Sequence, residues 1–182
     1  MAEMYIHGVA TREVTAILEK MCGLEVSAMQ VSRATEMLDA EFKKWREQPL
    51  PEPIKYPLLD ARYEKVRRED NTVVDCALLI AHGITESGRR CVLGVNVELS
   101  EAEVHWRKFL ELLIVRGLHG LKLIVSDNHV GLKAARMSVF PSVPWQRCLF
   151  HLQQNTTTHI PKKNMQQEVH NDIRDVFNMP TR

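Results

Sequence analysis

The sequence lacks most of the features that would place it outside ordinary globular proteins. It has four cysteines in 182 residues and no Cys-x-x-Cys pair, so it predicts neither a disulfide framework nor a four-cysteine zinc site. Its apolar runs fall far short of the roughly 20 residues that a membrane-spanning helix needs. It also shows no recognisable signal peptide. We therefore expect a reduced, cytoplasmic protein that has no membrane partner.

A strong charge of one sign is also lacking. Lysine and arginine number 24 and aspartate and glutamate 23, which leaves a formal net charge of +1. A nucleic-acid partner must therefore be inferred from local basic clusters and not from the total. Three such clusters are present, at 65–68, 89–90 and 162–163, and each is equally compatible with a solvated surface.

Residues 1–47 have the apolar spacing of helices. Thr11 fits the N-cap of one helix, Gly23 interrupts the pattern, and Ser27 fits the N-cap of a second. Two helices joined by a turn containing glycine predict a DNA-binding helix-turn-helix, although a plain helical hairpin fits equally well. In the first interpretation the second helix enters the major groove. Its DNA-contacting residues would then be Ala28, Gln30 and Arg33.

Residues 48–55 contain three prolines and are predicted to form a stiff linker. Strand patterns follow within 56–182. We expect strands at 58–66, 73–82, 90–97 and 121–126, a short strand at 145–149, and helices at 131–140 and 165–176. Residues 100–103 have the form of a capping box, which opens a helix with an apolar face. That face comprises Trp106, Phe109, Leu110 and Leu113.

This order of elements predicts an α/β fold with a mixed sheet and flanking helices. It matches the ribonuclease-H-like architecture, in which carboxylates project from the first and fourth strands. Asp60 and Asp127 occupy those two places, each at the end of an apolar run. Two neighbouring carboxylates repel each other unless a divalent cation neutralises them, so the pair predicts a metal site. The alternative is a pair of aspartates that cap turns.

Sequence blocks along the chain carry a resemblance to a known family. The most specific are Arg-Gly-Leu-His-Gly at 116–120, Val-Ser-Asp-Asn-His-Val-Gly-Leu-Lys-Ala-Ala at 125–135 and Trp-Gln-Arg-Cys-Leu-Phe-His at 145–151. Together they resemble the Mutator-like family of bacterial insertion-sequence transposases, in consistent order over nearly the whole chain. The resemblance implies an acidic triad of two aspartates and one glutamate, with Asp60 and Asp127 as the catalytic, metal-binding aspartates.

The same resemblance implies a reaction and its partners. Two Mg²⁺ (or Mn²⁺) ions would join the carboxylates to the scissile phosphate for strand cleavage and strand transfer. The partners would be the terminal inverted repeats of the element and the target DNA. The intact enzyme would be a homo-oligomer associated with the nucleoid.

The chain departs from the family pattern at the third carboxylate, because no residue matches the motif of the glutamate. Glu168 is a conceivable substitute, but Glu168, Asp172 and Asp175 have the spacing of a solvated helix face. We therefore expect a fragment or truncated copy, with a core incomplete at its C-terminus and little transposition activity alone. One alternative is a non-catalytic protein that binds element ends or inhibits an intact enzyme. Another is a ribonuclease-H-like nuclease with other substrates.

A Cys-x-x-His pair, Cys148 and His151, supplies only half of a tetrahedral zinc shell and has no partner pair in the sequence. We expect Cys148 to pack inward and His151 to lie near the active site. His129, Arg147 and His151 are the further residues predicted to contact DNA, and a turn role is the alternative for His129.

Overall fold

The computed structural model describes residues 11–23, 25–68 and 70–179, except for the side chains of residues 11, 12, 28 and 163. The chain divides into two compact units, Met1–Gln48 and Pro49–Arg182, and each is described by itself. No helix within the described ranges is both long enough and apolar enough to cross a membrane.

The first unit contains helices α2 (Thr11–Cys22) and α3 (Ala28–Glu47). Ser27 is the N-cap of α3, as expected, and it forms a capping box with Gln30. Gly23 follows α2 with φ of +63°, a conformation that glycine adopts without strain. The expected N-cap role of the Thr11 side chain lies outside the described residues.

Val14, Leu18 and Val31 form the small core of this unit, with Val26 packed against it. Met21 and Met37 recur at the same helical spacing but lie outside this core. Their side chains are 78% and 72% exposed, because a pair of helices buries only a narrow stripe of each.

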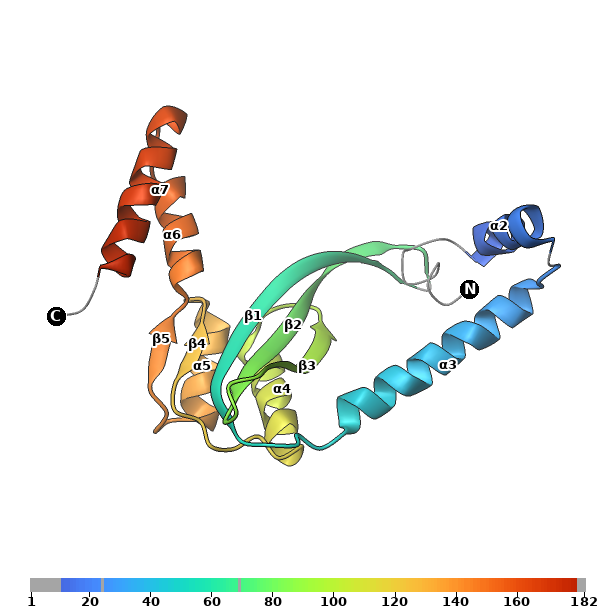
Figure 1. Cartoon of the computed structure of the whole chain (residues 1–182), viewed down its shortest axis with the longest axis horizontal. Helices are drawn as coiled ribbons and strands as arrows, with labels where there is room; N and C mark the ends of the chain where they lie inside the picture. Colours follow the sequence, from blue (N-terminus) through green and yellow to red (C-terminus); the bar gives the residue numbers. More distant parts are fainter. Residues whose placement is uncertain (1–10, 24, 69, 180–182) are drawn as a thin grey trace. The chain divides into compact units, whose positions relative to one another are not determined.

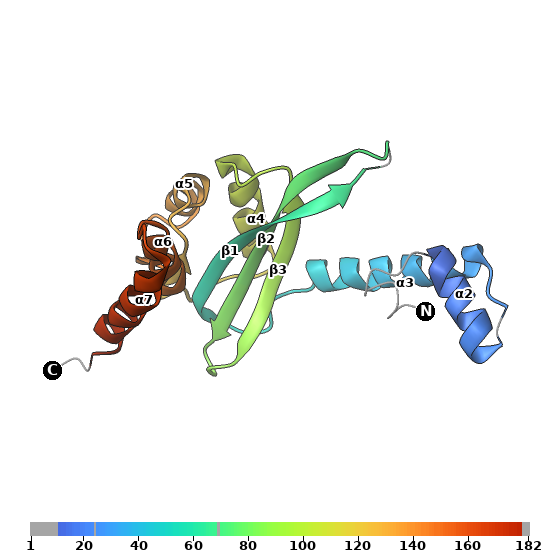
Figure 2. The ribbon, with the colours of Figure 1, turned by 90° about the horizontal axis from the view of Figure 1, so that it is seen from above.

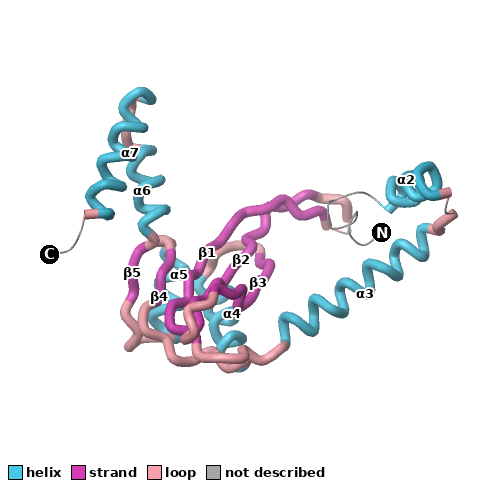
Figure 3. Tube along the Cα trace, viewed as in Figure 1, coloured by secondary structure: helices cyan, strands magenta, loops and turns pink. Residues whose placement is uncertain are grey.

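The second unit is a sheet with helices (Figures 1 and 3). Its elements are β1 (Ile54–Arg67), β2 (Val73–Thr85), β3 (Arg90–Glu98), α4 (Glu103–Val115), β4 (Ile124–Ser126), α5 (Val130–Val139), β5 (Trp145–Arg147), α6 (Leu149–Thr158) and α7 (Lys163–Asn178).

The five strands lie in the order β3-β2-β1-β4-β5. β1, β2 and β3 form antiparallel pairs, whereas β4 is parallel to β1 and β5 is parallel to β4. This mixed sheet with its flanking helices confirms the ribonuclease-H-like fold that the sequence predicted. The order places β1, the first strand of the unit, at the centre of the sheet, directly beside β4.

Helices α4 and α5 cover one face of the sheet (Figure 2). The four expected apolar residues of α4 are its buried residues, and they join the main core. Gly94 in β3 lets α4 approach closely, because a Cβ there would lie 3.1 Å from side-chain atoms of both Leu113 and Phe109. Burial of these large side chains against the sheet provides the main stabilisation of the unit.

Several boundaries differ from those predicted. β1 begins at Ile54, inside the range expected to be linker, because the Ile54 amide donates to the carbonyl of His119. β4 covers only three of the six residues expected for it. The capping box at 100–103 is not formed: Ala102 is the N-cap of α4, and no side chain caps it. Helix α6 was not predicted, and none of its residues is fully buried.

Helices α6 and α7 pack against each other and end the described chain. The Gln153 side chain donates to the carbonyl of His170 at 2.7 Å and so joins the two helices. The amphipathic pattern expected at 165–176 lies within α7.

Candidate active site at the edge of β1 and β4

The parallel pairing of β1 with β4 brings the two aspartates level with each other. Leu58 pairs with Val125 and Leu59 with Ser126, so the next positions in this register are Asp60 and Asp127. β1 continues past Asp60 to Arg67, one residue beyond the end of the strand predicted at 58–66. What ends at Asp60 is its pairing with β4. The side chains of Asp60 and Asp127 are 48% and 36% exposed, so a substrate can reach both carboxylates.

Each carboxylate is held by a neighbouring main-chain amide. Asp60 Oδ1 accepts a hydrogen bond from the Ala61 amide at 2.9 Å, and Asp127 Oδ1 accepts one from the Asn128 amide at 2.6 Å. These hydrogen bonds restrict the side-chain rotamers. They also place one oxygen of each aspartate next to main chain whose position the sheet determines.

Strand β5 and the start of α6 bring two basic groups to these carboxylates. Ser126 pairs with Arg147, and the Cys148 amide donates to the Ser126 carbonyl at 2.7 Å. Arg147 Nε then lies 4.0 Å from Asp127 Oδ1. One turn into α6, His151 Nε2 lies 3.7 Å from Asp60 Oδ1. Both residues were predicted to contact DNA, and the structure shows that each also faces one of the aspartates.

Two nitrogen atoms at this site are buried without a hydrogen-bond partner. They are Arg147 Nε and His151 Nδ1. Buried polar groups nearly always have hydrogen-bond partners. We therefore expect Arg147 Nε and His151 Nδ1 to bond to water or to a bound ligand. The expected inward packing of Cys148 is met in part, since this residue is half-buried.

Ser126 connects the end of β4 to β5. It is 2% exposed, and its hydroxyl donates to the carbonyl of Asp127 at 2.8 Å. The same hydroxyl accepts a hydrogen bond from the indole Nε1 of Trp145 at 2.9 Å. Lys133 and Arg136 of α5 lie over the Trp145 ring, with distances of 5.4 and 5.9 Å to its centroid. The main chain that carries Asp127 is therefore held by Trp145 of β5, whose ring in turn packs against α5.

Glu101 supports the site and was missed in the sequence. His129, the N-cap of α5, has its Nδ1 3.6 Å from Glu101 Oε2. Two residues on, a Cβ at Gly131 would lie only 2.2 Å from the carbonyl oxygen of Glu101. The first turn of α5, which directly follows Asp127, thus rests on the segment before α4. The sequence carries one signal of this packing, which is the glycine in the first turn of the expected helix. Glycine weakens a helix, so its presence there indicates a close approach of another segment.

The predicted DNA-contacting residues of α3 have different surroundings. Arg33 is exposed. The Gln30 carboxamide oxygen accepts a hydrogen bond from the Ser27 amide at 2.8 Å, so this oxygen already caps its own helix. The side chain of Ala28 lies outside the described residues.

A third carboxylate does not join Asp60 and Asp127 within the described part of the chain. No three His, Cys, Asp or Glu side chains there form a group that could hold a metal ion. The acidic residues of the last helix, Glu168, Asp172 and Asp175, are exposed on α7.

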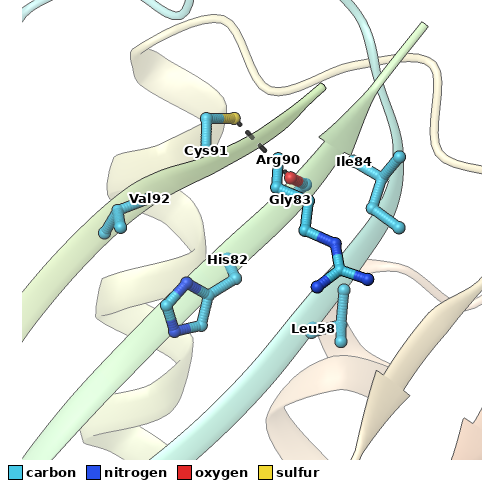
Figure 4. A pocket seen from close by; sticks show the side chains of 7 residues that line it. All are labelled: Leu58, His82, Gly83, Ile84, Arg90, Cys91 and Val92. Carbon is cyan, nitrogen blue, oxygen red and sulfur yellow. Dashed lines mark hydrogen bonds between the residues drawn. The ribbon is translucent and has the colours of Figure 1, made fainter. Parts of the chain in front are cut away.

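A hollow of about 500 Å³ lies elsewhere on the sheet (Figure 4). Its lining includes Leu58, His82, Arg90 and Val92, and the Arg90 side chain extends toward Leu58. The thiol of Cys91 donates to the Gly83 carbonyl at 3.7 Å, and burial raises the pKa of that thiol. The lining is largely apolar and includes no carboxylate, so this hollow is chemically distinct from the aspartate pair.

A family model described as transposase, Mutator family, matches residues 1–181. The transposase for insertion sequence element IS406 of Burkholderia multivorans is 53% identical over 184 residues, which cover 100% of this chain and 47% of that protein. The transposase for element ISRM5 of Rhizobium meliloti is 46% identical over 164 residues, which cover 90% of this chain and 41% of that protein.

A third relative, the transposase for IS256 in transposon Tn4001 of Staphylococcus aureus, is 44% identical over 166 residues, covering 90% of this chain and 42% of that protein. The chain therefore spans about half the length of the curated relatives it matches. Among solved structures, a Drosophila P element transposase strand transfer complex is similar with a TM-score of 0.47 and 13% identity. The similarity covers 85% of this chain and 41% of that chain.

Proposed function

The chain belongs to the Mutator family of transposases, and from this premise we propose that it provides two of the catalytic carboxylates of a DNA transposase. The reaction is cleavage of DNA strands at the ends of an insertion sequence and transfer of those ends into target DNA. Asp60 and Asp127 are the catalytic residues. The protein works on DNA at the nucleoid, and the intact enzyme acts as a homo-oligomer.

One observation carries this proposal: the β1–β4 register that places Asp60 beside Asp127. Strand-end aspartates that merely cap turns would have no reason to lie level on adjacent parallel strands. Both side chains are also partly exposed at the same edge of the sheet, where a phosphodiester can approach them.

The donor set fits a magnesium or manganese ion. Mg²⁺ prefers oxygen ligands, and one or two carboxylates together with substrate phosphates are its usual partners in enzymes of phosphoryl transfer. Asp60 and Asp127 are such carboxylates, and the DNA supplies the phosphate oxygens. When bound, a divalent cation there would supply Lewis acidity toward the phosphodiester and the attacking oxygen.

The chain's own residues hold and orient the substrate. The Arg147 guanidinium lies 4.0 Å from Asp127, so it can donate to a phosphate oxygen brought to the same edge. His151 lies 3.7 Å from Asp60 and can donate from Nε2 either to that carboxylate or to the DNA. His129, at the N-terminus of α5, is 44% exposed and can contact a phosphate near Asp127.

Two carboxylates are one fewer than the family resemblance implies for catalysis. We propose that the third lies in the portion of the relatives that this chain does not span. The 182-residue chain alone would then bind DNA and metal but show little or no transposition.

The experiment is a chimera in which this chain replaces the corresponding half of the Burkholderia multivorans relative, tested for cleavage of element-end DNA in Mg²⁺ and Mn²⁺. Asp60→Asn and Asp127→Asn should each lower cleavage by more than about a hundredfold, as for other groups that stabilise transition-state charge. Asp172→Asn, an exposed aspartate of α7, is the matched control and should keep the activity. Full activity after either of the first two changes would show that these roles are wrong.

A second function is favoured by the first unit. Helix α3 begins at a well-formed capping box and presents the exposed Arg33 near its start. As the recognition helix of a helix-turn-helix, it would bind terminal repeats without any catalysis, and such a chain would inhibit an intact enzyme by occupying its sites.

Band shifts separate this function from the catalytic one. The 182-residue chain should bind a duplex copied from the element end more tightly than a duplex of unrelated sequence. Arg33→Ala should remove that preference, whereas Arg174→Ala, another exposed arginine, should not. Equal binding of the wild-type chain to both duplexes would rule out end recognition.

A further inference from the structure

The aspartate pair lies beside a long segment that contains no carboxylate side chain. Residues 128–167 have no aspartate or glutamate, although the chain has 23 of them in 182 residues, a frequency that would put about five there. The segment carries five lysines and arginines and three histidines. It includes α5, β5 and α6, which follow β4 in the chain (Figure 1). Positive charge is therefore concentrated on one side of the site, although the net charge of the whole chain is only +1.

Three carboxylates from outside the segment face it, and each has a role described above. Asp60 and Asp127 are the proposed ligands of the divalent cation, so a bound ion offsets their charge. Glu101 faces His129, and its side chain is only 13% exposed. The segment's own side chains are neutral or basic, so the surface that they present to solvent suits a polyanion.

Lys133 of α5 is an exposed cation of this segment close to the site. Its amide donates to the carbonyl of His129 at 3.0 Å, so it lies one helical turn beyond the N-cap of α5. Its Nζ lies 5.4 Å from the centroid of the Trp145 ring. Trp145 and Arg147 share one face of β5, since successive strand residues point to opposite faces. Lys133 therefore continues the face on which Arg147 lies, and Arg147 faces Asp127.

Helix α6 extends this surface beyond the sheet (Figure 1). Its ten residues span about 15 Å and include no acidic side chain. Gln154 and Asn155 are exposed on it, and side-chain amides of this kind donate to the phosphate oxygens of DNA. Carboxylates return along the chain only at Glu168 of α7. A strand of DNA at β5 would therefore meet donors, and no acid of α6, along this helix.

The sheet on the β2–β3 side of the pair has a different chemistry. Helices α4 and α5 cover one face of the sheet, and Leu58 and Asp60 point to the other. On that uncovered face Leu58 pairs with His82, and His82 pairs with Val92. Leu58 and Val92 are 37% and 44% exposed. An exposed apolar patch suits a protein surface better than a phosphate backbone.

We propose that duplex DNA held at Asp60 and Asp127 runs across β5 and the adjoining surfaces of α5 and α6, and not across β2 and β3. Lys133 binds a phosphate on this path, next to the phosphate that Arg147 contacts. The contact is to the backbone, so it is independent of base sequence. This inference rests on the proposed function, because it takes the aspartate pair as the place where DNA reacts.

The test compares two exposed cations on opposite sides of the aspartate pair. Lys133→Met removes the charge and keeps an unbranched apolar stem against Trp145. Arg90→Met is the matched control on the β2–β3 side, where the Arg90 side chain extends toward Leu58 (Figure 4). Lys133→Arg keeps the charge. Circular dichroism of each variant shows whether the fold is retained.

Binding of the complete chain to a fluorescent duplex of about 30 base pairs is measured by anisotropy between about 50 and 200 mM NaCl. The duplex has an unrelated sequence, because backbone contacts carry no sequence information. Loss of one phosphate contact makes the slope of log K against log salt shallower by about 0.9 and lowers the affinity on the order of tenfold at about 0.1 M salt. We expect both effects in Lys133→Met. Arg90→Met and Lys133→Arg should keep the wild-type slope and affinity.

The outcomes separate this inference from the proposed function. A wild-type slope for Lys133→Met would overturn the path across β5, and so would a loss confined to Arg90→Met. A loss in Lys133→Arg as large as that in Lys133→Met would also overturn it, because DNA would then not depend on the charge. Each of these results leaves the proposed function standing. A wild-type chain that binds no duplex would instead overturn DNA binding by this chain, and the path with it.

Discussion

The contact between Gly131 and Glu101 allows a test of how the site is supported. In Gly131→Ala the new Cβ would lie 2.2 Å from the Glu101 carbonyl oxygen, 3.0 Å from the Glu103 amide nitrogen and 3.1 Å from the Ala102 carbonyl carbon. Ordinary contact begins at 3.4 Å, so the start of α5 must move by 3.4 minus 2.2, or 1.2 Å. All three obstacles are main-chain atoms, which cannot rotate away as a side chain can.

The expected cost follows from two opposing effects. Overpacking of this kind costs about 1–3 kcal/mol, and a rigid main-chain neighbour places it at the upper end. Alanine recovers about 1 kcal/mol relative to glycine within a helix. We therefore expect a net loss of about 2 kcal/mol in the free energy of unfolding of the second unit, or about 1 M in the urea midpoint for a typical slope near 2 kcal/mol per M.

The assay is urea unfolding followed by tryptophan fluorescence in a Trp45→Phe background. Trp106 and Trp145 then report on the second unit alone, and Trp106 is fully buried. Ser138→Ala, at an exposed position of the same helix, is the control and should stay within about 0.5 kcal/mol. A Gly131→Ala midpoint equal to that of the control would refute the close packing of α5 on Glu101.

Three further predictions concern single contacts. Ser126→Ala removes the acceptor of the partly buried Trp145 indole and should lower the free energy of unfolding by about 1 kcal/mol in the same urea assay; an unchanged midpoint would contradict it. Ser27→Ala should cost the first unit about 1 kcal/mol, measured as loss of helical circular dichroism on heating, whereas Ser32→Ala at an exposed helix position should not. Arg147→Met should strengthen Mn²⁺ binding, measured by electron paramagnetic resonance, because the substitution removes the positive charge beside Asp127. Weaker binding would show that Arg147 instead holds Asp127 in place for the ion.

The order of elements could be predicted because each long element has a clear period. The apolar residues of α4 recur at three- and four-residue spacing, and the four that were expected to be buried are buried. Helix α6 has no such pattern, since its later residues are threonine, asparagine and glutamine and none is fully buried. The Gln153 side chain also joins it to α7 through a hydrogen bond, which no sequence period could indicate.

The boundary errors come from contacts between distant residues. The prolines before Ile54 predicted a longer linker, but the Ile54 amide finds an acceptor at His119, far along the chain. Similarly, Ser100 has the right spacing to cap α4, yet its carbonyl accepts from the His105 ring at 2.8 Å and Ala102 becomes the cap. Local motifs state which bonds are possible, and tertiary contacts decide which of them form.

The aspartate pair could be placed from the sequence because only the strand order was needed. Once the first and fourth strands are neighbours, any residues that follow their paired positions lie side by side, and this held for Asp60 and Asp127. The surroundings of the pair could not be placed in the same way. Glu101 reaches the start of α5 only because α4 and α5 pack together, and no pattern in the sequence relates it to His129 or Gly131.

The surroundings also change the physical argument for a metal ion. From the sequence, two adjacent carboxylates seemed to require a divalent cation to offset their repulsion. The structure shows Arg147 beside Asp127 and His151 beside Asp60, at 4.0 and 3.7 Å, so protein groups can offset part of it. Repulsion alone is therefore weaker support for the ion than it was from the sequence. The stronger support is chemical: Asp60 and Asp127 present exposed carboxylates, each with one oxygen held by a main-chain amide, and oxygen donors of this kind are the ligands that Mg²⁺ prefers.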